Sequence, residues 1–194
     1  MACDSCSTDQ ERVEYANAPL TTPLPQSASS AGSSAQSKSS EQITAQSLVA
    51  KQKFPVESPK VPFTPCYMFF YGSLMDIDIL QLIAGLKSSP TMAPATITGF
   101  RMRMWGPFPT IIKAETGKVT GTYWKCDQED HFQRLKAYET NAYSWCFCDA
   151  ETEDGKVLKG CRTFCWRGNP ESDELEDGKF DLAHYQKYTK GRYV

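Results

Sequence analysis

A glycine and a serine directly after an apolar run form the first place where the chain offers chemistry. The run Cys66–Tyr71 is typical of a central strand covered on both faces, and it ends at Gly72-Ser73. Asp76 then suits the N-cap of a helix with apolar residues at helical spacing over 79–86. Because Gly72 has no Cβ and a helix N-terminus favours negative charge, a small carboxylate fits beside the main chain here. The pattern predicts an anion-binding loop formed by Tyr71, Gly72, Ser73 and Leu74; the alternative is a tight strand-to-helix turn with Asp76 as a simple cap.

Glu139 is the second candidate for chemistry. We expect Asp127 to cap a helix running through Glu129 and Asp130, and along it Phe132, Leu135 and Glu139 fall at same-face spacings. A carboxylate that continues an apolar stripe is buried, and burial raises its pKa toward the range that a general base and acid needs. In the alternative, the helix ends at residue 137 or 138 and Glu139 points into solvent.

The elements that must position these two residues are mostly strands. Alternation over Ala95–Trp105 changes phase at Gly99-Phe100, which predicts a strand with a β-bulge. A short strand over Thr110–Ala114, a turn at Thr116-Gly117 and a strand over Val119–Cys126 follow.

The C-terminal part adds a hairpin and a helix. The hairpin joins Tyr143–Ala150 to Val157–Trp166 through a turn at Asp154-Gly155. The helix spans Asp181 to Thr189 and presents Leu182, Tyr185 and Tyr188 on one side. Antiparallel strands with inserted and appended helices predict an α+β domain of about 130 residues, enough for one core.

The first part of the chain has a different composition. Residues 26–47 are mainly Ser, Ala, Gln and Lys, and prolines follow at intervals up to Pro65. Such a segment buries too little apolar surface to offset its ordering entropy. We therefore expect a disordered tail and linker over 1–60, followed by one domain over 61–194.

Charge and hydropathy exclude several classes of partner. The 21 basic and 23 acidic residues give a net charge of −2, so there is no basic excess for nucleic acid. The apolar stretches are too short to cross a membrane, and the N-terminus has no apolar signal segment. We expect a cytoplasmic protein with eight reduced cysteines.

No metal site is predicted. Cys146, Cys148, Cys161 and Cys165 fall on alternating positions of the predicted hairpin, whereas structural zinc sites use close ligands on a tight turn, so we interpret them as core thiols. The pair Cys3-x-x-Cys6 stands alone in the tail. Two further pairs are assigned to the surface: the histidines His131 and His184, and the arginines Arg101 and Arg103, of which either arginine is also suitable for a pocket mouth.

Several segments together resemble one known family. They begin with Phe69–Met75, which holds the Tyr-Gly-Ser-Leu element, and end with Leu135–Tyr143, which holds Glu139; between them stand Ala93–Phe100, Phe108–Ile111 and Gly117–Tyr123. In order and spacing the chain is similar to the γ-glutamylcyclotransferase-like superfamily over roughly residues 66 to 166. Within that superfamily it resembles the branch named after plant avirulence-induced genes, the AIG2-like branch.

The resemblance implies a small, mostly antiparallel β-barrel with flanking helices and a pocket at one end. It also implies an enzyme that cyclises a γ-glutamyl amine or γ-glutamyl amino acid to 5-oxoproline, releasing the amine without a metal or organic cofactor. Carried over to this chain, Tyr71, Gly72, Ser73 and Leu74 bind the glutamyl group, and Glu139 is the general base and acid. Tyr143 is a further candidate for substrate binding, and the partner is a small molecule.

Two positions depart from the family pattern. Many relatives have Asp where Lys136 stands, and Arg where Trp145 stands. A missing arginine removes a salt bridge that could orient the site. These departures motivate the alternative function, a non-catalytic domain that keeps the pocket and binds a small anion or a protein.

Overall fold

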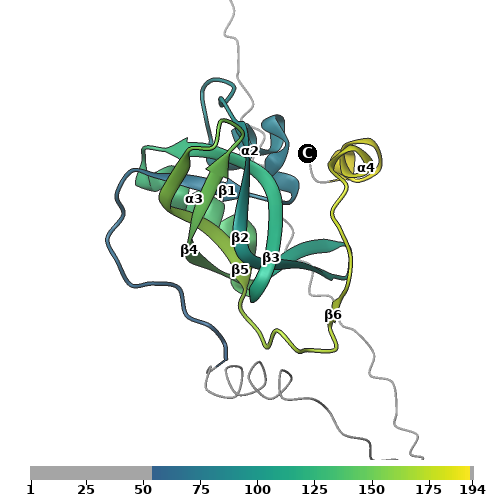
Figure 1. Cartoon of the computed structure of the whole chain (residues 1–194). Coiled ribbons are helices and arrows are strands. Elements are labelled where there is room, and N and C mark those ends of the chain that lie inside the picture. The colour runs from purple at the N-terminus through teal and green to yellow at the C-terminus, as the bar shows by residue number, and fades with distance from the viewer. Residues whose placement is uncertain (1–53, 193–194) are drawn as a thin grey trace, which may run out of the picture.

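The strands form a closed, mixed barrel. The computed structural model describes residues 54–192, shown in Figure 1. The barrel strands are β1 (Cys66–Phe70), β2 (Ala93–Trp105), β3 (Phe108–Cys126), β4 (Tyr143–Thr152) and β5 (Val157–Trp166). They follow the order β3-β1-β5-β4-β2, and β2 pairs with β3 to close the barrel, while the short β6 (Leu175–Glu176) extends from β2. Only β1 and β5 run parallel among these pairs, so the predicted small, mostly antiparallel barrel is confirmed.

Short helices lie outside the barrel. Between β1 and β2 stand the 3₁₀ turn η1 (Ser73–Met75) and α2 (Ile77–Ala84), and between β3 and β4 stand α3 (Glu129–Glu139) and the turn η2 (Thr140–Ala142). After β6 the chain runs back alongside the β2–β3 hairpin to α4 (Leu182–Tyr188), which precedes the turn η3 (Lys190–Arg192) (Figure 1).

Alternate residues of β1 face two different cores, because successive side chains of a strand point to opposite faces. Met68 and Phe70 pack with α2, α3 and α4, whereas Phe69 and Tyr71 pack inside the barrel with residues of β2, β3, β4 and β5. Burial on both faces explains why the run Cys66–Tyr71 is apolar throughout, as the sequence indicates.

The predicted irregularity at Gly99-Phe100 is confirmed as a register shift, although the extra residues belong to β3, and the predicted turn at Thr116-Gly117 is wrong. Thr98 pairs with Lys118 and Phe100 with Lys113, so residues 114–117 of β3 stand opposite Gly99. The strand continues through Gly117 (φ 145°), where a Cβ would lie 3.2 Å from the Phe100 carbonyl carbon. The glycine signals a close approach between two strands, and not a chain reversal.

The hairpin of β4 and β5 has the predicted partners, with Cys148 opposite Cys161. One prediction about its cysteines is wrong: Cys146 and Cys165 are joined as a disulfide. These two residues lie diagonally across the strand pair, since Ser144 pairs with Cys165 and Cys146 with Thr163. Within residues 54–192 the other cysteines are free thiols.

Of the two predicted helix N-caps, one is confirmed and one is wrong. Asp76 caps α2, accepting hydrogen bonds from the amides of Asp78 (3.0 Å) and Ile79 (3.1 Å). Asp127 does not cap α3; that helix begins at Glu129 with Gln128 before it, and Asp127 instead pairs with Lys125 at 3.0 Å. In α4, Tyr185 is buried as expected, but Tyr188 is exposed.

Residues before β1 also contact the barrel. The Val56 amide donates to the Arg167 carbonyl (2.7 Å), Glu57 pairs with Arg167 (2.8 Å), and Ser58 accepts a hydrogen bond from the Trp145 amide (3.0 Å). The predicted tail up to residue 53, with its Cys3-x-x-Cys6 pair, lies outside the described residues. In the part that is described, no helix is long and apolar enough to cross a membrane.

Gly121 tests whether close packing of β1 on β3 holds the barrel together. A Cβ at this position would overlap the Phe70 carbonyl oxygen and lie 2.8 Å from the Phe69 ring. We expect Gly121→Ala to lower the free energy of unfolding by roughly 3 kcal/mol, because backbone must move to admit the methyl group.

Urea unfolding measures this loss, and Gly191→Ala is the matched control because a Cβ there meets nothing within 4 Å. Equal stabilities for the two variants would contradict the described approach of β1 to β3.

Candidate active site

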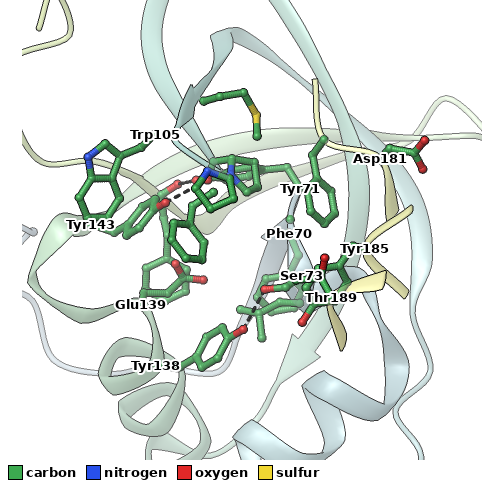
Figure 2. Close-up of a pocket in the computed structure, with 18 of the residues that line it drawn as sticks. Phe70, Tyr71, Ser73, Trp105, Tyr138, Glu139, Tyr143, Asp181, Tyr185 and Thr189 are labelled. Atoms are coloured by element: carbon green, nitrogen blue, oxygen red, sulfur yellow. Dashed lines mark hydrogen bonds between the residues drawn. The ribbon is translucent and has the colours of Figure 1, made fainter. Parts of the chain in front are cut away.

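One cavity of about 600 Å³ collects all the residues that the sequence singles out for chemistry. It lies between the end of β1, the tip of the β2–β3 hairpin, the end of α3 and the C-terminal segment 179–189. The predicted residues on its wall are Tyr71, Gly72, Ser73, Leu74, Glu139 and Tyr143. Figure 2 shows several of them around the same space, with Glu139 between Tyr143 and Tyr138 in this view.

The loop after β1 lines the cavity and has free amides. The carbonyls of Gly72 and Ser73 accept hydrogen bonds from Met75 (2.9 Å) and Asp76 (3.0 Å), which closes the 3₁₀ turn η1. Within residues 54–192, the amides of Gly72, Ser73 and Leu74 have no hydrogen-bond acceptor. Unpaired amides at the start of a helical turn are suited to an anion.

Gly72 has a second role that sequence reasoning missed. Its φ of −130° lies outside the left-handed region in which glycine is favoured. A Cβ here would instead lie 2.9 Å from Cγ of Pro109, which stands near the start of β3. The missing side chain therefore lets the β2–β3 hairpin approach the loop and close one side of the cavity.

Two tethers fix the loop. The hydroxyls of Ser73 and Tyr138 lie 2.9 Å apart and share a hydrogen bond, which joins the loop to α3. Asp76 accepts hydrogen bonds from Gln186 (2.7 Å) and Lys190 (2.8 Å), which join it to α4 and η3. Burial alone would raise the pKa of Asp76, but these donors and the Ile79 amide hold it below its usual value.

Glu139 is a half-buried carboxylate without a partner among the described residues. It is the last residue of α3, on the face of Phe132 and Leu135, so the alternative of an earlier helix end does not hold. Within residues 54–192 it makes no hydrogen bond or ion pair with any side chain. Because burial disfavours the charged form, the pKa of Glu139 rises from 4.5 to about 8.

The backbone leaves the helical conformation directly after Glu139. Thr140 has φ 60°, an uncommon conformation for a residue that is not glycine, and it also lines the cavity. Such strained residues are often found beside functional side chains, where the surrounding structure holds them. Here the change of conformation at Thr140 ends α3 at Glu139, which lines the cavity.

Two tyrosine hydroxyls near Glu139 already donate hydrogen bonds to backbone carbonyls. Tyr71 donates to the Phe164 carbonyl (2.7 Å) and Tyr143 to the Pro109 carbonyl (3.1 Å). Burial, and next the charge of Glu139, raise the pKa of both phenols well above 10. Both therefore stay protonated, whereas Glu139 can exchange a proton near neutral pH.

Sequence reasoning missed much of the cavity wall. Trp105, Pro107 and Phe108 come from the tip of the β2–β3 hairpin, and Phe180 and His184 come from the C-terminal segment. The signal for the first group was available: the tip Trp105–Pro109 is apolar, unlike an ordinary exposed turn. His184 is exposed, as predicted, but it stands at the cavity.

The two departures from the family pattern lie away from the cavity. Trp145 is buried against Phe132, with ring centroids 5.8 Å apart, and the Arg162 guanidinium lies 4.6 Å from its ring centre. Lys136 is exposed and donates to Gln133 at 3.3 Å. Neither residue is part of the cavity wall.

The two predicted surface arginines also lie away from the cavity. Arg103 donates to the backbone carbonyls of Leu175 and Glu176 and so fastens β6 to β2, while Arg101 is exposed. Neither lines the cavity. In the described part of the chain no group of three or more His, Cys, Asp or Glu residues is arranged to hold a metal ion.

Comparison with known proteins points to one family. Residues 68–185 match the family described as "Gamma-glutamyl cyclotransferase, AIG2-like". The chain is also similar to AIG2-like protein C of Arabidopsis thaliana, at 26% identity over 129 residues, or 66% of this chain and 73% of that protein. The matched range includes both the loop after β1 and Glu139.

Two solved structures share the fold. One protein of Arabidopsis thaliana, known from a solution structure, has 24% identity and a TM-score of 0.51, covering 69% of this chain and 89% of its own. Another from the same organism has 18% identity and a TM-score of 0.53, covering 71% and 82%. At these identities the likeness establishes the barrel fold and carries no residue roles.

The pKa of Glu139 predicts how stability changes with pH. Because folding raises this pKa from 4.5 to about 8, the folded state holds a proton that the unfolded state releases, and stability falls as pH rises between these values. Glu139→Gln has no proton to release. We expect its free energy of unfolding, relative to wild type, to increase by about 1 kcal/mol per pH unit between about pH 5.5 and 7.5.

Urea unfolding at several pH values measures this difference. Glu153→Gln, at an exposed turn position, is the control and should track wild type throughout. A difference between Glu139→Gln and wild type that does not change with pH would show that the Glu139 carboxyl is solvated.

Proposed function

The chain belongs to the gamma-glutamyl cyclotransferase, AIG2-like family, and from this premise we propose that it cyclises a γ-glutamyl compound to 5-oxoproline and releases an amine. The substrate is a γ-glutamyl amine or a γ-glutamyl amino acid, and the expected compartment is the cytoplasm. One observation carries the proposal: an unpaired, half-buried carboxylate and a row of free amides belong to residues that line the same cavity.

The reaction joins two ends of one molecule. In the proposed mechanism the free amides of Gly72, Ser73 and Leu74 hold the glutamyl group. Holding the folded conformer brings the α-amine beside the γ-carbonyl, and much of the rate enhancement follows from this placement. A cavity wall that excludes water also strengthens each hydrogen bond to the substrate.

Glu139 moves the proton in this mechanism. Its carboxylate takes a proton from the α-ammonium, and the freed amine attacks the γ-carbonyl. A C–N bond to the α-nitrogen forms, Glu139 returns its proton to the leaving nitrogen, and the C–N bond to that nitrogen breaks. The α-nitrogen gives its second proton to the released amine, so the products are 5-oxoproline and an ammonium ion. A pKa of about 8 favours both roles, because neither form of the carboxyl is scarce near neutral pH.

Replacing Glu139 tests the proposed chemistry. Wild type is incubated with a panel of γ-glutamylamines, γ-glutamyl amino acids and glutathione, and 5-oxoproline is measured. We expect at least one compound to be cyclised, and Glu139→Gln to reduce the rate by about 10²- to 10⁴-fold. Glu153→Gln is the control with an unchanged rate.

No product from wild type, or equal product from Glu139→Gln, would contradict the proposal. In the first case, thermal stabilisation by glutamate-like ligands without turnover favours the alternative, a pocket that binds a small anion without catalysis.

The pH dependence gives an independent test of the same role. Because the base must be ionised, kcat/KM should rise with pH and level off near the pKa of about 8. Below it we expect about a tenfold loss per pH unit. Initial rates at low substrate concentration over about pH 5.5 to 9 measure this limb, and a pH-independent kcat/KM below pH 7 is incompatible with Glu139 as the base.

A further inference from the structure

The cavity is larger than a glutamyl group requires. About 150 Å³ is enough to enclose a benzene molecule, whereas this cavity has about 600 Å³. The free loop amides and Glu139 occupy one part of its wall. The remainder, which we call the outer wall, is formed by the hairpin tip Met104–Pro109 and by the C-terminal segment 179–189. The leaving amine of a bound substrate would lie against this outer wall.

The outer wall is mainly apolar and aromatic. It contains Trp105 and Phe108 from the hairpin tip, and Phe180 and Tyr185 from the C-terminal segment, the latter two with ring centroids 5.7 Å apart. The nearby hydroxyl of Tyr143 donates to the Pro109 carbonyl and is not offered to a ligand. Such a surface attracts an apolar group through burial and gives little reward to a polar one.

The aromatic residues of the hairpin tip differ in how they are held. Trp105 is packed against Trp166, with ring centroids 5.3 Å apart. The ring centroids of Phe108 and Trp105 are 6.1 Å apart, and 43% of the Phe108 surface is exposed. A large apolar side chain left partly in water beside a cavity is available to cover a ligand.

The charges at the cavity do not form a clamp for a second carboxylate. Among the described residues that line it, there is no arginine. Lys179 is exposed and is followed closely by Asp181, whose carboxylate caps α4 by accepting from the His184 amide at 3.0 Å. Exposed charges of opposite sign are screened and exert little net attraction on a distant carboxylate.

From this wall we propose that the leaving amine of the substrate carries a bulky aromatic or similarly apolar group and no second carboxylate. The inference rests on the proposed function and narrows its substrate class. It predicts that γ-glutamyl amides of arylalkylamines are preferred over those of small amines, and over glutathione with its terminal carboxylate.

Three compounds with the same γ-amide bond test the preference: γ-glutamyl-phenethylamine, γ-glutamyl-ethylamine and glutathione. With the full chain, 5-oxoproline release gives kcat/KM for each. We expect the phenethylamide to exceed both others by roughly 10- to 100-fold, the range that burial of a phenyl-sized group corresponds to.

Two phenylalanines of similar exposure provide a matched pair of variants. Phe108 lines the cavity at 43% exposure, and Phe147 on β4 lies outside it at 48% exposure. Phe108→Ala should lower the ratio of kcat/KM for phenethylamide to that for ethylamide several-fold, chiefly through KM. Phe147→Ala should leave both constants unchanged. Thermal unfolding checks that both variants are folded.

The outcomes separate the two proposals. Release of 5-oxoproline without a preference for the phenethylamide, a preference for glutathione, or equal losses on both amides in Phe108→Ala would overturn the substrate class alone. If no compound yields 5-oxoproline, the proposed function fails, and the substrate class fails with it.

Discussion

The carboxylate of Asp76 connects the segments that surround the cavity. It accepts hydrogen bonds from two amides of α2, from Gln186 of α4 and from Lys190 of η3, and it stands two residues after the loop with the free amides. Lys190 also pairs with Asp78 at 2.7 Å. A buried carboxylate with this many donors stays ionised, and removing them would leave its charge desolvated. The start of α2, the loop and the C-terminal wall of the cavity therefore depend on one another.

The Glu139 carboxylate differs from that of Asp76 in having no hydrogen-bond donors within the described part of the chain. Asp76 is buried and Glu139 is half-buried, but Asp76 receives hydrogen bonds and Glu139 receives none from residues 54–192. Their pKa values accordingly move in opposite directions, downward for Asp76 and up to about 8 for Glu139. Pairing makes Asp76 a structural anchor that does not change its charge near neutral pH. Lack of pairing leaves Glu139 able to exchange a proton, at the expense of stability.

The sequence could predict what depends on local pattern. The continuous apolar run of β1, the Asp76 cap, the bulge at Gly99 and the phase of Glu139 on α3 all follow from spacing within a few residues. Features that depend on distant contacts could not be predicted. Glycine at position 117 is a residue type typical of turns, but the Phe100 backbone opposite Gly117 keeps β3 extended. Lys190 reaches Asp76 across 114 positions, and the Pro109 ring that requires Gly72 belongs to another hairpin.

The cavity wall also has parts that depend on local sequence pattern and parts that depend on distant contacts. The groups assigned to the chemistry, the loop amides and Glu139, lie at the end of β1 and the end of α3, and their sequence patterns can be recognised separately. The outer wall is assembled from the β2–β3 hairpin tip and the C-terminal segment, whose residues have no common motif and meet only in the fold. Changes in Phe108 or Phe180 can thus alter the space proposed for a leaving amine without touching the carboxylate proposed to move the proton. A preserved chemical centre in this fold therefore does not by itself specify the amine, and the shape and charge of the outer wall must be considered for each chain.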